Sequence, residues 1–216
     1  MRLKQIRAAA LDNGLDVYGA FHPDTDDFSQ AASLILLGPA ADFWSVFTAS
    51  DIYNDDQPDP VDRWSADVIP RIAQSLGARP IFPFGGPPYA PFLSWAKTSG
   101  RAWDAPVGML VHDLTGLMVS YRGALAFDTK LTLPEQTFQN PCETCTTKPC
   151  LTACPVGALS SERSYDVPAC YDYMDTNAGN TCLTQGCLVR RACPASTGAG
   201  RLTEQSALHM RAFRGK

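Results

Sequence analysis

The sequence has no cysteine in its first 141 residues and none in its last 23, although it contains eight in all. It also has no long apolar run, because the longest one, around Ser33 to Leu37, falls far short of the roughly 20 residues of a transmembrane helix. Its formal charge of −4 gives it no excess of basic residues, which nucleic-acid-binding surfaces require. We therefore expect neither a membrane nor a nucleic-acid partner.

The chain also lacks low-complexity tracts and the apolar core of a secretory signal. Ala8 to Leu11 follows a basic N-terminus, but it is shorter than the roughly seven residues that such a core needs. A hydrophobic content of 45% and a charged content of 19% are typical of a globular protein. These features predict a protein of the reducing cytoplasm, where disulfides are rare.

What the sequence does have is a dense group of cysteines between Pro141 and Pro194. The first run reads C-x2-C-x4-C-x3-C-P and the second begins with a lone cysteine and ends C-x4-C-x5-C-P. The eight candidate ligands are Cys142, Cys145, Cys150, Cys154, Cys170, Cys182, Cys187 and Cys193. Each 4Fe–4S cluster takes four thiolates, so eight cysteines predict two such clusters.

Two of the cysteines, Cys154 and Cys193, directly precede a proline. In two-cluster bacterial ferredoxins the cysteine before proline ligates the cluster of the other motif. We therefore predict a crossed pairing, in which one cluster is held by Cys142, Cys145, Cys150 and Cys193, and the other by Cys154, Cys170, Cys182 and Cys187.

Other uses of eight cysteines have to be weighed. The Cys142-x2-Cys145 spacing alone also suits structural zinc, and a single cluster would leave some thiols free. Disulfides would fit the even number of cysteines. The two Cys-Pro endings and the C-x3-C-P spacing favour clusters over these alternatives.

The remaining pattern predicts an α+β protein in two domains. Residues 1–138 should form an α/β-type domain with a mixed or antiparallel sheet, and residues 139–216 a ferredoxin-like domain with a closing helix. Helices are expected over residues 1–13, 42–50, 62–76 (kinked or divided at Pro70) and 203–213, with a short helix that begins at Phe92 and ends at Gly100. Strands are expected over residues 15–21, 33–37 and 79–84, and a β-meander over residues 107–127.

The N-terminal half shows no constellation of acid, base and nucleophile, so we assign no catalytic residue. His112, near a turn, is expected to be structural, and Arg122 is expected to be a surface residue although it could contact an anion. At about 140 residues this half is larger than a simple electron carrier needs, which favours a small-molecule ligand there.

Two stretches carry a family resemblance. Cys154-Pro155-Val156-Gly157-Ala158-Leu159 resembles the end of a bacterial ferredoxin motif. The order of the eight cysteines, with Cys170 in Ala169-Cys170-Tyr171-Asp172-Tyr173, resembles the ferredoxin-like domain of epoxyqueuosine reductases. Four residues separate Cys145 from Cys150 where that family usually has two, and five separate Cys187 from Cys193 where it usually has three. These insertions bear on the pairing of the ligands and leave their number unchanged.

The resemblance implies an N-terminal α+β domain that encloses a cobalamin, which is reduced through the clusters and attacks an epoxide-bearing nucleoside of tRNA. Phe84, however, stands where the family has a general-acid aspartate, and phenylalanine has no proton to donate. The family's Gly-Lys-Asn segment and helical-repeat domain are not in this sequence. We expect a short, divergent relative without epoxyqueuosine reductase activity.

Three functions follow as hypotheses. The first is a ferredoxin-like protein that passes electrons between redox partner proteins. The second is a small oxidoreductase that holds a substrate, a corrinoid or a flavin in its N-terminal domain next to a cluster. The third is a binding module stabilised by zinc.

Overall fold

The computed structural model describes residues 3–135 and 137–215 of the chain. The chain divides into two compact units. The first unit runs to Arg101 and resumes over Ser120–Thr137, and the second takes Ala102–Val119 and continues from Phe138. The boundary expected after residue 138 therefore marks the chain's final return to the second unit, which already contains residues 102–119.

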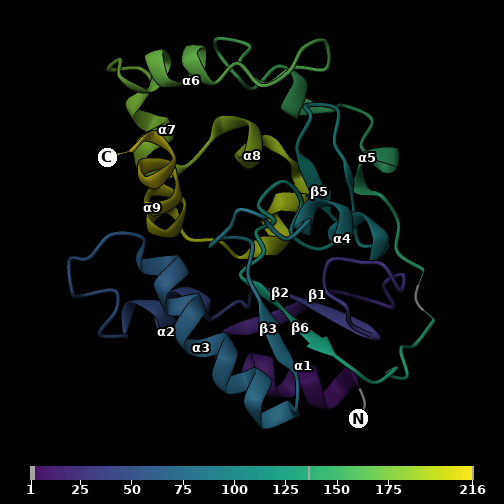
Figure 1. The fold of residues 1–216 in the computed structure, drawn as a ribbon. Helices are drawn as coiled ribbons and strands as arrows, with labels where there is room; N and C mark the ends of the chain where they lie inside the picture. The colour runs from purple at the N-terminus through teal and green to yellow at the C-terminus, as the bar shows by residue number, and fades with distance from the viewer. Residues whose placement is uncertain (1–2, 136, 216) are drawn as a thin grey trace. The chain divides into compact units, whose positions relative to one another are not determined.

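The first unit is built on a four-stranded sheet. Its strands lie in the order β1 (Leu15–Phe21), β2 (Ser33–Pro39), β6 (Gly123–Phe127) and β3 (Arg79–Ile81). Every neighbouring pair is antiparallel (Figure 1). All five residues of β6 and six of the seven in β2 are buried. Burial on both faces explains why these strands are continuously apolar in the sequence rather than alternating.

Four helices belong to the same unit: α1 (Leu3–Leu11), α2 (Phe43–Thr48), α3 (Pro60–Leu76) and α4 (Phe92–Thr98). α1 packs on β1 and on α3, and α3 packs on β3 and β6. Pro70 does not divide the helix, because α3 continues through it with Val68, Ile69 and Ile72 buried. Helices and an antiparallel sheet together make the protein α+β.

The expected β-meander over residues 107–127 is wrong. β4 (Ala102–Asp104) and β5 (Leu110–His112) form a separate antiparallel pair in the second unit, whereas β6 pairs with β2 and β3 in the first. Leu117 to Tyr121 forms no strand. Instead, the Leu117 amide donates a hydrogen bond to the Ser196 hydroxyl at 3.1 Å. An apolar run expected to pair in a sheet is therefore used for packing in the second unit.

The second unit otherwise consists of short helices. They are α5 (Pro141–Thr144), η1 (Pro149–Leu151), α6 (Val167–Met174), α7 (Asn180–Gln185), α8 (Leu188–Ala192), η2 (Pro194–Ala199) and α9 (Thr203–Arg214). The closing helix α9 packs beside α7 (Figure 1). Within the described ranges, the chain has no helix with the length and apolarity to cross a membrane.

Candidate metal centres

The eight cysteines gather around two cavities of the second unit. The first cavity has a volume of about 340 Å³ and is lined by Cys142, Cys145, Cys150 and Cys193. The second is much smaller, about 20 Å³, and is lined by Cys154, Cys170, Cys182 and Cys187. The structure thus brings together the same two sets of four that the Cys-Pro endings predict.

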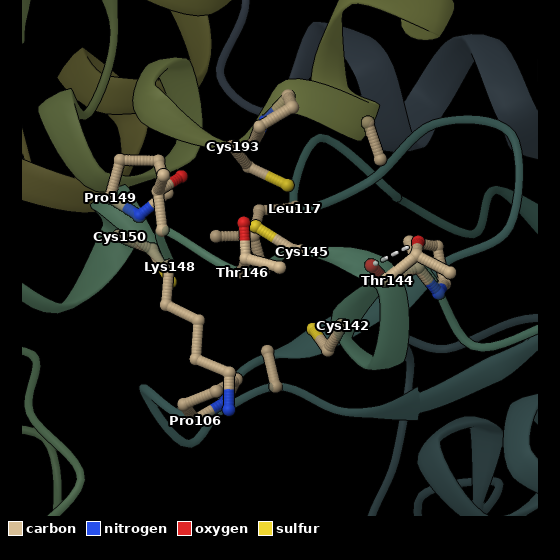
Figure 2. Close-up of a pocket in the computed structure, with 15 residues that line it drawn as sticks. Pro106, Leu117, Cys142, Thr144, Cys145, Thr146, Lys148, Pro149, Cys150 and Cys193 are labelled. Atoms are coloured by element: carbon tan, nitrogen blue, oxygen red, sulfur yellow. Dashed lines mark hydrogen bonds between the residues drawn. The ribbon is translucent and has the colours of Figure 1, made fainter.

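The first cavity is shaped by two local features of the backbone. Asn140 caps α5 by accepting a hydrogen bond from the Cys142 amide at 3.0 Å, which fixes the start of the first motif. Lys148 adopts a left-handed conformation, with φ of 40°, and turns the chain into η1 and Cys150. Figure 2 shows the sulfurs of Cys142, Cys145 and Cys193 facing a common space, with Lys148 extending along its rim.

α8 links the two cavities. Cys187 lies at its N-cap and lines the second cavity, whereas Cys193 lies at its C-cap and lines the first. The segment from Cys150 to Cys154 likewise begins at the first cavity and ends at the second. Six residues of helix rise by about 9 Å, so the two cysteine sets are close neighbours.

Hydrogen-bond donors approach the sulfurs of the second cavity. The Ala158 amide donates to Cys154 Sγ at 3.3 Å. The Tyr165 hydroxyl donates to Cys170 Sγ at 3.2 Å. Such bonds favour a negatively charged sulfur, which is the form that binds metal.

Burial and the neighbouring thiols, in contrast, raise the pKa of these cysteines and so disfavour the thiolate form when no metal ion is bound. Burial raises the pKa of the Cys142 thiol, and the neighbouring thiols Cys193, Cys150 and Cys145 raise it further. In the second set, burial likewise raises the pKa of Cys182, and Cys187, Cys170 and Cys154 add to the effect. Four closely spaced thiolates repel one another in a partly buried site, so each set is suited to a cationic centre.

Zinc and a 4Fe–4S cluster place different demands on four thiolates. Four zinc ligands converge to about 2.3 Å from a single ion, whereas a cubane distributes its ligands over four irons. Among the described residues, no three His, Cys, Asp or Glu side chains are grouped as ligands of one metal ion. The first set of sulfurs surrounds a cavity of about 340 Å³ and the second a cavity of about 20 Å³. All eight cysteines are free thiols in the structure.

Sequence reasoning missed two side chains beside the second cysteine set. One is Tyr165, whose signal would have been an aromatic residue five positions before the lone Cys170. The other is Arg190 on α8, which donates a hydrogen bond to the Leu117 carbonyl. Burial lowers the pKa of Arg190, while Cys187 and Tyr165 raise it, so a cation lies within electrostatic reach of a ligand.

Two expectations for the N-terminal half have different outcomes. Arg122 is not a surface residue: its side chain is only 14% exposed and burial lowers its pKa. Its Nη1 lies 3.5 Å from Asp62 Oδ1, and its Nε has no hydrogen-bond partner among the residues that the structure describes. His112 has the expected structural role, because its Nδ1 accepts a hydrogen bond from the Leu114 amide at 3.2 Å.

Comparison with known proteins finds no relative of this chain. The sequence matches no family model, and neither the curated proteins nor the solved structures yield a match.

Proposed function

We propose that the protein is a ferredoxin-like electron-transfer protein with two 4Fe–4S clusters. The observation that carries the proposal is the division of eight cysteines into two sets of four around two cavities. Cys142, Cys145, Cys150 and Cys193 hold the first cluster, and Cys154, Cys170, Cys182 and Cys187 hold the second. When bound, the clusters supply one-electron chemistry whose potential depends on hydrogen bonding and solvent exposure.

The surroundings of the two cavities suggest different tasks. The exposed residues Thr144, at the end of α5, and Thr146 and Lys148, in the loop that follows, form part of the wall of the first cavity. The second is enclosed by apolar side chains, among them Leu159 and Met210. The first set is therefore the better placed to exchange electrons with a redox partner, because polar and charged side chains beside it can contact one.

The decisive experiment measures iron and acid-labile sulfide in protein purified without oxygen, with a spectrum before and after dithionite. We expect about eight of each per chain and bleaching of the cluster absorption on reduction. Zinc without sulfide would overturn the proposal and leave a metal-stabilised binding module. About four iron atoms and four sulfides per chain would indicate one cluster and overturn the proposal of two.

A second candidate function is a small reductase that holds a ligand in the first unit. Arg122 favours it, because a buried guanidinium with an unpaired Nε and a long contact to Asp62 is suited to an anionic group. The test is co-elution of the cluster-loaded protein with hydroxocobalamin or with FMN, with Arg122→Lys as a variant that retains the charge but not the planar fork. If the protein retained neither hydroxocobalamin nor FMN, the reductase function would be overturned and only the electron-transfer function would stand.

A further inference from the structure

The Tyr165 hydroxyl is directed at a sulfur of the second set. We propose that Tyr165 is a positioning residue that raises the reduction potential of the second cluster by donating a hydrogen bond to Cys170 Sγ. This inference rests on the proposed function, because it assigns a tuning group to one of the two clusters. Its geometric basis is the distance of 3.2 Å between the hydroxyl oxygen and the sulfur.

The donor residue, Tyr165, and the acceptor residue, Cys170, both lie at the start of α6. Tyr165 directly precedes Asp166, whose side chain caps α6 by accepting a hydrogen bond from the Ala169 amide at 3.0 Å. Cys170 is the next residue of that helix. Because the cap fixes the first turn of α6, it also fixes the spacing between the hydroxyl and the sulfur.

The ring of Tyr165 is held independently by the end of α9. It stacks on Phe213, with ring centroids 5.9 Å apart and an interplanar angle of 11°. Phe213 is held in turn by Tyr171, whose ring lies edge-on at 5.1 Å and whose hydroxyl donates to the Phe213 carbonyl at 2.6 Å. Next to it, Arg214 pairs with Asp175. The ring packing would persist if the Tyr165 hydroxyl alone were removed.

The direction of the effect follows from charge. Reduction adds one electron to the cluster, and part of that negative charge resides on the cysteine sulfurs. A donor to Sγ therefore stabilises the reduced state more than the oxidised state.

The test is Tyr165→Phe in the cluster-loaded, full-length protein. Tyr173→Phe is the matched control, because Tyr173 lines the second cavity but its hydroxyl donates to the Ala178 carbonyl at 3.4 Å rather than to a sulfur. Redox titration followed by EPR resolves the two clusters. We expect Tyr165→Phe to lower the reduced-to-oxidised ratio of one cluster severalfold at a fixed potential, where tenfold corresponds to about 59 mV for one electron.

The other cluster, and both clusters of Tyr173→Phe, should keep the wild-type potential. A second readout is the coupling of an exchangeable proton to the reduced second cluster, which should be present in wild type and Tyr173→Phe and lost in Tyr165→Phe. Unchanged potentials, or equal shifts in both variants, would overturn the inference while iron and sulfide contents still supported two clusters. Absence of sulfide from the wild-type protein would overturn the proposed function and the inference with it.

Discussion

At the scale of single residues, the two cysteines that precede proline decide how the two motifs share the cavities. Cys154 belongs to the first motif in sequence but lines the second cavity, and Cys193 does the reverse. Each motif therefore contributes three cysteines to one cavity and one to the other, and the proposed clusters would be shared in the same way. Loss of either residue should damage the cluster opposite its own motif.

This exchange can be tested by pairs of substitutions. Cys154→Ala should lower the iron content from about eight to about four per chain, because one cubane loses a ligand. Adding Cys170→Ala should lower it no further, since both residues serve the same cluster, whereas adding Cys150→Ala should remove nearly all iron. The reverse pattern in the two double variants would show that the motifs are not crossed.

The sequence singled out the eight cysteines because their spacing is itself the signal, and the two Cys-Pro pairs indicated how the cysteines divide between the two cavities. It could not reveal Tyr165 as a partner of Cys170. That contact depends on the cap at Asp166 and on Phe213, which lies 48 residues after Tyr165 in the chain. The prediction that Arg122 is a surface residue was wrong for a related reason, because only the fold determines whether a charged side chain is buried.

At the scale of elements, the end of α7 fixes where Cys187 begins. Gly186 ends this helix with φ of 94° and ψ of 164°, a conformation open essentially to glycine alone. A Cβ atom there would lie 2.7 Å from Cβ of Ser206 on α9. The close approach of α7 and α9 therefore depends on the absence of a side chain at this position.

Gly186→Ala should consequently destabilise the protein by about 1–3 kcal/mol through backbone strain, with a further cost from the contact with Ser206. Gly200→Ala is the control, because Gly200 also has a positive φ, 57°, but has nothing within 4 Å of an added Cβ. It should cost only about 1–2 kcal/mol. Thermal unfolding of the cluster-loaded proteins compares the two, and an equal loss in both would show that the α7–α9 contact does not matter.

Most elements were predictable from apolar periodicity and from glycine or proline at their ends. The helix over residues 62–76 and the strands from Leu15 and Ser33 lie where the pattern placed them. The meander was not predictable, because local apolar runs carry no information about their partners. Leu117 packs in the second unit, whereas β6, beginning six residues later, lies between β2 and β3 in the first.

At the scale of the whole molecule, the two units differ in what holds them together. The first has a core of buried aliphatic and aromatic side chains around β2 and β6. In the second, the two apolar clusters include the cysteines themselves, with Cys150 and Cys193 in one and Cys182 in the other. Metal binding should therefore contribute directly to the folding of the second unit.

Removing the metal should accordingly unfold the units unequally. After iron is withdrawn by a chelator under mild oxidation with thiols then reduced, hydrogen exchange should rise throughout the second unit, while amides of β2 and β6 stay protected. The β4–β5 pair gives the clearest readout of this difference between the units. In sequence it lies between the two segments of the first unit, but it belongs to the second unit. Its amides should lose protection together with α7 and α9. If the pair instead remained protected with β2 and β6, or if both units lost protection alike, metal would not be what stabilises the second unit.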